Sequence, residues 1–175
     1  KDPHGPMSFR HFVLGAIAIF FYVGVEVGIP NTANLYMSGL EGVGPVVAGT
    51  LVGFYWFCMM LGRLLGGAIG AKVSSKQMLT FANILAIVFV LCLMFIPESV
   101  RMSIPGVDAQ VPVSMVFMFL CGLCTSVMFG SIFNRAAEGL GKYTPVASGI
   151  FMALICGGGI LPFIQGLVAD AAGFI

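Results

Sequence analysis

Five long apolar stretches follow one another along the chain, separated by shorter segments that contain most of its polar residues. A helix that crosses a bilayer needs about 20 consecutive, mostly apolar residues. Each stretch reaches that length, and none alternates apolar with polar positions as a membrane barrel strand does. The pattern therefore predicts five transmembrane helices, at about residues 11–36, 45–70, 77–97, 111–134 and 145–169.

The connections between these stretches are short and rich in residues that end helices. Glycine, proline, serine and charged side chains gather in them, and such clusters are typical of turns and loops. Short connections place consecutive spans next to each other and antiparallel. The four connections read SGLEGVGP, KVSSKQ, PESVRMSIPGVDAQVP and RAAEGLGKYTP.

The composition supports a membrane protein. Of the 175 residues, 59% are hydrophobic and 9% are charged, and the mean hydropathy is +1.05. Soluble domains carry roughly 25% charged residues, so this chain cannot cover its surface with polar groups and is expected to contact lipid. The net charge of +1 gives no indication of a nucleic-acid partner. The sequence predicts an all-α, multi-pass membrane protein.

Basic residues predict how the spans are oriented. Cytoplasmic loops of membrane proteins carry an excess of Lys and Arg. With the N-terminus inside, seven of the eight basic residues fall on the cytoplasmic side and Arg101 falls outside. We therefore expect a cytoplasmic N-terminus, an external C-terminus, and a further helix after the final segment DAAGFI. The seven residues on the inner side are Lys1, Arg10, Arg63, Lys72, Lys76, Arg135 and Lys142.

One acidic residue, Glu26, stands inside the first apolar stretch, in FFYVGVEVGIP. It lies about 15 residues into the span, which places it roughly 20 Å along the helix axis. An unpaired carboxylate at that depth costs several kcal/mol, so such residues pair or face a cavity. No Lys or Arg is expected at a comparable depth. We favour a water-exposed cavity position, and the alternative is a neutral acid bonded to a neighbouring helix.

Further polar groups follow Glu26 on the same span. Tyr22 stands one turn before it, Asn31 and Asn34 follow it, and Pro30 is expected to bend the helix. Hydroxyl, carboxylate and amide groups together both donate and accept hydrogen bonds, as the hydroxyls of a sugar require. A bulky cation would suit the acid and the aromatic residues equally well. At this point the chemical class of the solute stays open.

Two other spans contribute candidate contacts. Trp56 lies beside Tyr55 in the second span, and an aromatic face can stack on a sugar ring or serve packing alone. Gln165 lies in the fifth span, after a run of three glycines at 157–159 and Pro162. This run predicts a helix that can bend or slide, which alternating access requires.

Small residues recur at intervals of four within the spans. Glycines at this spacing let helix backbones approach closely in lipid, where no hydrophobic force pulls helices together. We expect these positions to mark helix contacts. The sets are Gly24 with Gly28, Gly49 with Gly53, and the series Gly62, Gly66 and Gly70.

Enzymatic and metal-binding signals are weak. The pair Cys121 and Cys124 has the spacing of redox centres, but it stands in the middle of a span. His4 and His11 lie near the N-terminus and form no metal set with a cysteine. The sequence therefore predicts no enzyme, no metal site and no cofactor.

Three segments resemble the second half of major facilitator transporters, in the branch of fucose permeases and glucose/galactose transporters. They read FFYVGVEVGI, GRLLGGAIGAKVSSKQML and SVMFGSIFNRAAEGLGKYTPVASGIFMALICGGGILPFIQGLVADAAG, and the similarity runs through nearly the entire chain. The resemblance implies that residues 1–175 form a partial C-terminal transmembrane domain. Its five spans would be helices seven to eleven of twelve, forming most of a six-helix bundle, with the N-terminal half and the last helix missing.

The resemblance also implies a function: secondary active transport of a hexose or deoxyhexose across a bacterial inner membrane, by alternating access and symport with H⁺. The N-terminal half of the same transporter would then be a partner. In this family helices seven, eight, ten and eleven line the cavity, which favours six residues as sugar ligands and three as the inner gate. The ligands are Tyr22, Glu26, Asn31, Asn34, Trp56 and Gln165; the gate residues are Gly62, Arg63 and Gly66.

Two departures from the family pattern bear on this interpretation. The fucose-permease branch often has a neutral amide where Glu26 stands, and a proline near Gly130. An exporter of cationic or amphipathic compounds, with Glu26 as counter-charge, is the alternative. A membrane-embedded enzyme or a purely structural bundle is disfavoured, because no set of nucleophile and base stands out.

Overall fold

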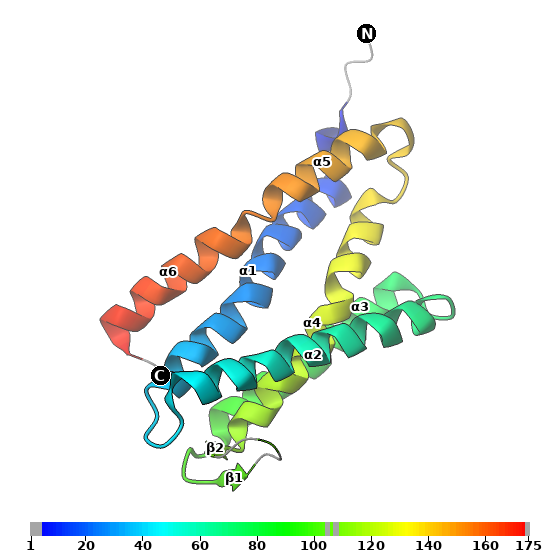
Figure 1. The fold of residues 1–175 in the computed structure, drawn as a ribbon. Helices are drawn as coiled ribbons and strands as arrows, with labels where there is room; N and C mark the ends of the chain where they lie inside the picture. Colours follow the sequence, from blue (N-terminus) through cyan, green and yellow to red (C-terminus); the bar gives the residue numbers. More distant parts are fainter. Residues whose placement is uncertain (1–4, 104–105, 107–108, 174–175) are drawn as a thin grey trace.

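The computed structural model describes residues 5–103, 106 and 109–173. Five helical stretches within them are long and apolar enough to cross a membrane, which confirms the predicted all-α membrane fold. Figure 1 shows them packed beside one another, with α2 crossing in front of α4. The first four are α1 (Arg10–Ser38), α2 (Gly44–Gly70), α3 (Ser75–Phe95) and α4 (Ser114–Ala137), and the fifth is divided into α5 (Thr144–Leu154) and α6 (Gly157–Ala172).

Four shorter elements accompany these helices in the described chain. The 3₁₀-helices η1 (Pro6–Ser8) and η2 (Gly141–Tyr143) precede α1 and α5. Strands β1 (Arg101–Ser103) and β2 (Gln110–Pro112) pair antiparallel with Met102 opposite Val111. They form a hairpin between α3 and α4.

Helices α1 and α4 lie at the centre of the bundle. Helix α4 packs against α1, α2 and α3, and α1 packs in addition against α2, α5 and α6. Helix α3 is peripheral, since Ala82 is its one buried residue. The peripheral position agrees with the place that the resemblance implies for the third span, away from the cavity.

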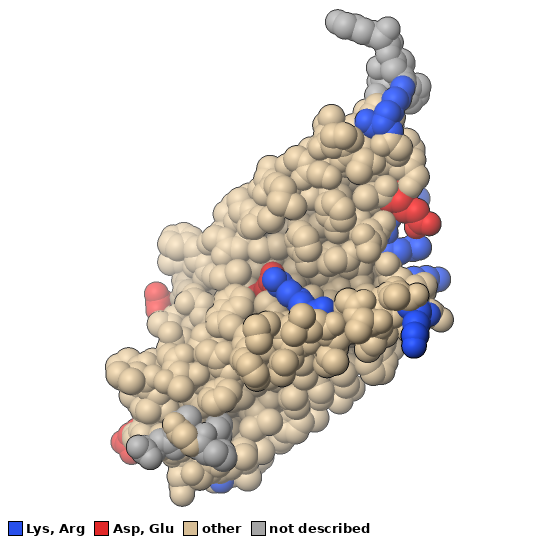
Figure 2. All heavy atoms as spheres, turned by 45° about the vertical axis from the view of Figure 1, so that its right-hand side comes forward, with Lys and Arg blue, Asp and Glu red and all other residues tan. Residues whose placement is uncertain are grey.

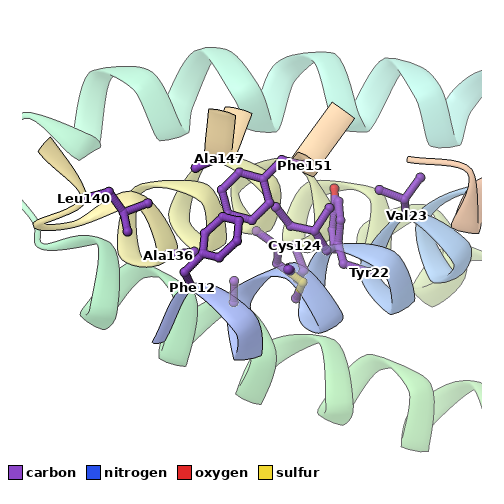
Figure 3. Packing of buried hydrophobic residues seen from close by; sticks show 12 residues of the cluster. Phe12, Tyr22, Val23, Cys124, Ala136, Leu140, Ala147 and Phe151 are labelled. Carbon is purple, nitrogen blue, oxygen red and sulfur yellow. The ribbon is translucent and has the colours of Figure 1, made fainter. Parts of the chain in front are cut away.

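Two apolar clusters stabilise opposite ends of the bundle. One lies where α1 begins, α4 ends and α5 begins, and in it the rings of Phe12 and Phe151 stand 5.0 Å apart (Figure 3). The other lies where α1 ends and α2 begins, with Met37 and Val111 among its fully buried members. Along α1 the buried residues of the first cluster reach Val23 and those of the second begin at Ala33. Glu26 stands between them.

Two approximate helix ends differ from the structure for clear local reasons. Helix α3 ends at Phe95 and not at 97, because Ile96 precedes Pro97 and a residue before proline is pushed into extended backbone. The fourth span begins at Ser114 and not at 111, because residues 110–112 form β2. An apolar strand that leads into an apolar helix lengthens the hydrophobic stretch without lengthening the helix.

The fifth span is interrupted, since Ile155 and Cys156 separate α5 from α6 just before the glycine run at 157–159. A Cβ atom on Gly157 would overlap the carbonyl oxygen of Phe20, and one on Gly158 would lie 2.9 Å from Cγ1 of Val23. The glycines therefore allow α6 to lie directly against α1.

Two of the three glycine sets contain glycines that lie at helix contacts in the structure. Gly24 and Gly28 face side chains of α6, and Gly62 and Gly66 face Ser126 and Val127 of α4. Gly49 and Gly53 have no described atom within reach of an added Cβ, and Gly70 has one distant neighbour. The prediction is confirmed for the first two pairs and is wrong for 49 and 53 within the described chain.

Candidate functional site

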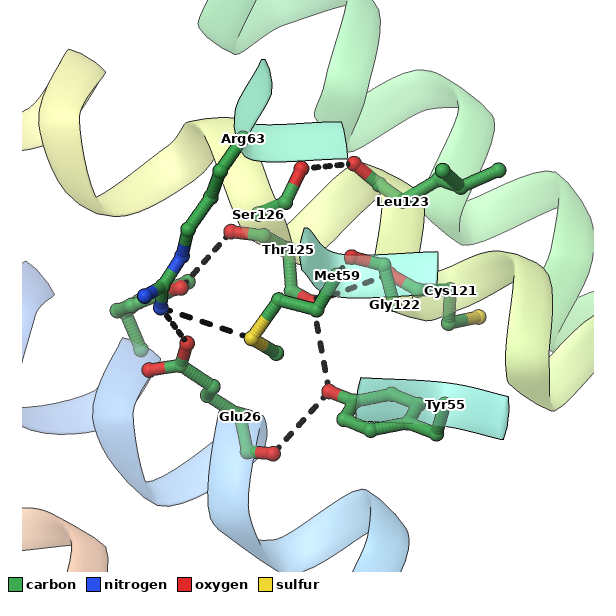
Figure 4. Close-up of polar contacts among 10 residues, drawn as sticks. Glu26, Tyr55, Met59, Arg63, Cys121, Gly122, Leu123, Thr125 and Ser126 are labelled. Carbon is green, nitrogen blue, oxygen red and sulfur yellow. Dashed lines mark hydrogen bonds and ion pairs between the residues drawn. The ribbon is translucent and has the colours of Figure 1, made fainter. Parts of the chain in front are cut away.

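A carboxylate and a guanidinium meet in the middle of the bundle. Nη2 of Arg63 on α2 lies 2.9 Å from Oε1 of Glu26 on α1. The glutamate side chain is 11% exposed and the arginine side chain 59% exposed. Figure 4 shows the arginine reaching toward Glu26, and Figure 2 shows one blue group beside a red one within the otherwise uncharged middle of a face.

This ion pair corrects the expectation that no cation reaches the depth of Glu26. That expectation compared backbone positions alone. The Cα–Cβ bonds of a helix tilt toward its N-terminus, and long side chains continue in that direction. Helices α1 and α2 run in opposite directions (Figure 1), so Glu26 leans toward the end where α1 begins and Arg63 leans away from it. The two side chains converge although their backbones lie at different depths.

A cavity of about 570 Å³ opens beside the pair. It lies between α1, α2, α4 and the C-terminal end of α5, the spans that the resemblance favours as cavity-lining. Its polar lining comes from Glu26, Arg63 and Ser126. The remaining lining residues are Val23, Phe129, Gly130, Met152 and Ile155.

A second cavity, of about 260 Å³, lies along α2 and shares Arg63 with the first. Trp56 lines it, together with Met59, Met60 and Leu64. Trp56 and Arg63 are seven residues apart, which is two helical turns, so both side chains project from the same face of α2. Arg63 therefore stands between an apolar, aromatic surface and a carboxylate.

Buried hydroxyl groups tie the three helices together next to the pair. Tyr22 of α1 donates to the carbonyl oxygen of Thr125 on α4 at 2.8 Å. Tyr55 of α2 donates to the carbonyl oxygen of Glu26 at 3.1 Å, and its hydroxyl lies 3.3 Å from Oγ1 of Thr125. These contacts fix α1, α2 and α4 relative to one another at the level of the cavity (Figure 4).

The structure brings two of the six predicted sugar ligands to the cavities. Glu26 lines the larger one and Trp56, 44% exposed, lines the smaller one. Tyr22 is buried, and its hydroxyl proton is already engaged by Thr125.

The other three predicted ligands lie away from both cavities. Asn31 is exposed on α1, and Asn34 accepts a hydrogen bond from the Ser38 hydroxyl at 3.3 Å. Gln165 is exposed on α6, with its amide against Gly28. Roles of these residues and of Tyr22 as sugar ligands stay predictions.

The three predicted gate residues make two kinds of contact. Gly62 and Gly66 let α2 approach α4, because a Cβ on either would overlap Ser126 or Val127. Arg63 does not point toward the inner loop; its guanidinium turns back to Glu26. A role of Arg63 in an inner gate of the whole carrier stays a prediction.

Sequence reasoning left two features of the site unrecognised. It named Arg63 as a gate residue without pairing it with Glu26, and it did not include Tyr55 among the candidate site residues. The spacing of seven between Trp56 and Arg63 is a signal that could have placed the arginine beside the aromatic surface. Nothing in the sequence of α2 indicates the partner of the Tyr55 hydroxyl, because that partner is a carbonyl on another helix.

No known family profile matches the chain. A glucose/galactose transporter of Brucella abortus is 36% identical over 175 residues, which covers 99% of this chain and 39% of the relative. The L-fucose-proton symporter of Escherichia coli is 25% identical over 169 residues, which covers 95% of this chain and 35% of the relative.

A solved structure agrees with these relatives. The major facilitator superfamily transporter FucP, in its outward conformation, matches 94% of this chain and 37% of its own length with a TM-score of 0.77 and 23% identity. The chain has the fold of part of a major facilitator superfamily transporter. The predicted resemblance to glucose/galactose and fucose transporters is confirmed, and the chain is a multi-pass membrane protein.

The transporter fold extends beyond this chain in its relatives. The chain spans less than two fifths of the length of each transporter that it matches. Both relatives are named as transporters, in agreement with the prediction of a transporter and not an enzyme.

Proposed function

We propose that this chain forms part of a secondary transporter that moves a neutral sugar, a hexose or deoxyhexose, and that the sugar binds beside Glu26 and Arg63. The observation that carries the proposal is the pairing of these two side chains at 2.9 Å on the wall of a cavity of about 570 Å³. The names of the relatives, a glucose/galactose transporter and a fucose–proton symporter, support the same solute class.

The paired groups suit a hydroxylated solute. An ionised carboxylate accepts hydrogen bonds only, and a guanidinium donates them only. Together they supply both an acceptor for the proton of a sugar hydroxyl and a donor to its oxygen. The hydrogen bonds that Arg63 makes within the described chain all use Nη2, so its other N–H donors are available to a solute.

Trp56 extends this surface. It lies two turns from Arg63 on the same face of α2, where its ring can stack on the apolar face of a pyranose. A polar pair next to an aromatic face is the combination that an amphipathic sugar ring requires.

Charge balance disfavours the alternative of a cation exporter. A cationic solute needs an uncompensated carboxylate, and the charge of Glu26 is already offset by Arg63. The pair is neutral as a whole, so an ion of either sign would have to displace one partner. A neutral solute needs no such displacement.

The whole carrier would contain a second half that closes the cavity from the other side. The lengths of the relatives support this arrangement. Alternating access would then use the break between α5 and α6, next to the cavity-lining Met152 and Ile155. We assign H⁺ as coupling ion, on the name of the symporter relative, and no cofactor.

The proposal also includes the location and orientation of the segment. We assign the segment to a bacterial inner membrane because it is similar to bacterial sugar transporters, and we expect lipid to contact the exposed apolar residues of α3 and α6. We assign the N-terminus of this segment to the cytoplasm, because six of the seven other basic residues still fall on that side when Arg63 is set aside.

The test is counterflow in proteoliposomes that contain the full-length carrier. Labelled glucose, galactose and fucose are compared with tetraphenylphosphonium, a lipophilic cation, and an imposed pH gradient is added in a second series. Exchange of at least one sugar, with no exchange of the cation, is the expected result. Exchange of the cation alone would overturn the sugar assignment, and sugar uptake indifferent to the pH gradient would overturn proton coupling.

A further inference from the structure

Pro30 removes one hydrogen bond from the middle of α1. In an α-helix the N–H of residue 30 would donate to the carbonyl oxygen of residue 26. Proline has no N–H, so the carbonyl of Glu26 loses its partner within the helix. Inside a membrane, a backbone carbonyl without a partner costs several kcal/mol, because water cannot replace the missing donor.

A side chain from another helix supplies the missing donor. Tyr55 of α2 is fully buried, and its hydroxyl donates to this same carbonyl at 3.1 Å. Figure 4 shows Tyr55 directed at the backbone of Glu26 while Arg63 approaches the carboxylate of the same residue. Glu26 is therefore attached to α2 at two points, its carbonyl and its side chain.

We propose that Tyr55 is a positioning residue: it replaces the amide that Pro30 lacks, and thereby holds the backbone of Glu26 where its carboxylate meets Arg63 in the cavity. Tyr55 acts through Glu26, because no part of its buried side chain lines either cavity. The effect on solute binding rests on the proposed function, whereas the hydrogen bond itself does not.

The geometry distinguishes this role from packing. Tyr55 also packs beside Gly122, where a Cβ would lie 2.7 Å from the Tyr55 carbonyl, and it belongs to an apolar cluster. Those contacts involve its backbone and ring. Tyr55→Phe keeps both and removes only the hydroxyl, so any effect of this variant reports on the hydrogen bonds.

The decisive experiment is a double-mutant cycle in the full-length carrier. Pro30→Ala restores an N–H that can donate to the Glu26 carbonyl within α1. Tyr55→Phe is then measured with and without the Pro30→Ala substitution, by thermal unfolding in detergent without solute. We expect it to lower Tm by about 2–4 °C when the proline is present and by much less when alanine replaces it.

A matched control is Tyr22→Phe. Its hydroxyl donates to the Thr125 carbonyl, which no proline deprives of a partner, so its effect should be the same in both backgrounds. Pro30→Ser restores the same amide and serves as the second background if the alanine variant is not recovered. Equal losses for Tyr55→Phe in the two backgrounds would overturn the proposal.

Sugar counterflow tests the positioning role. Tyr55→Phe should raise the half-saturating sugar concentration about 5- to 10-fold beside Pro30, with little change in the maximal rate. The rise should shrink when the amide is restored. An unchanged half-saturating concentration would mean that the hydroxyl only stabilises the bundle, which overturns positioning. Absence of sugar exchange in the unmodified carrier counts against the proposed function, and the unfolding cycle still decides whether Tyr55 replaces the amide.

Discussion

The carboxylate of Glu26 and the guanidinium of Arg63 lie 2.9 Å apart, although their helices place the two backbones at different depths. Each residue reaches the other because side chains on antiparallel helices lean in opposite directions. The pair neutralises a charge that the membrane interior would otherwise penalise. The arginine side chain stays 59% exposed and lines both cavities, where a solute could reach it.

Breaking the pair from one side should cost more than removing both charges. Glu26→Gln or Arg63→Gln leaves one charge without its partner, and we expect each to destabilise the carrier by about 1–3 kcal/mol, at the lower end because Arg63 is partly solvated. The double variant should recover part of this loss. Thermal unfolding of the two single variants and the double variant measures this recovery. If the stability loss of the double variant equalled the sum of the two single losses, the two groups would not interact.

Trp56 should determine sugar affinity. Trp56→Ala removes the aromatic face beside Arg63, and we expect the half-saturating sugar concentration in counterflow to rise about tenfold, since ring stacking contributes roughly 0.5–1.5 kcal/mol. Trp56→Phe should lose less. Phe57→Ala is the matched control, because Phe57 is an exposed aromatic of the same helix that lines neither cavity. Equal effects at 56 and 57 would exclude a specific role for Trp56.

Length and apolarity were enough to predict five spans, because lipid imposes both on any helix that crosses it. The ends of the spans were harder to predict. Val111 extends an apolar stretch while it pairs in a strand, and Pro97 ends a helix that composition alone would continue. Hydropathy measures how apolar a segment is and does not report its backbone conformation.

The site was predicted less completely than the fold. Glu26 stood out because a carboxylate within an apolar stretch is unusual, and Trp56 because an aromatic face can stack on a sugar ring. Arg63 was misplaced, because depth read from residue number ignores the length and direction of a side chain. Tyr55 could not be recognised, because its role depends on a proline in a different helix.

Two glycines in one turn should respond differently to the same substitution. A Cβ at Gly157 would overlap the carbonyl oxygen of Phe20, a backbone atom that cannot rotate away, whereas Gly159 has no described atom within 4 Å of an added Cβ. We expect Gly157→Ala to separate α6 from α1 and to destabilise the carrier by about 1–3 kcal/mol. Gly159→Ala should be neutral or slightly stabilising, because alanine favours helix more than glycine does.

Thermal unfolding of the two variants, with counterflow in parallel, measures the difference. Both replace glycine by alanine within α6, so changes in helix propensity are similar and only the contact with α1 differs. Similar stability of the two variants would show that α6 does not lie against α1 in the assembled carrier.

A thiol on the cavity wall should meet water, and one on the outer surface of α3 should meet lipid. Gly130 lines the larger cavity with open space for a side chain, and Ile87 is 60% exposed on the peripheral helix. In a full-length carrier with its native cysteines replaced, Gly130→Cys should react with a small, charged methanethiosulfonate at least tenfold faster than Ile87→Cys. Ionised thiolate forms readily only where water stabilises it, so depth alone does not produce this contrast. Added sugar should slow the reaction of the cysteine at position 130 and leave that at position 87 unaffected. Equal rates at the two positions would mean that water does not reach the cavity wall beside Glu26. Glu26 could then not bind a solute that enters from water.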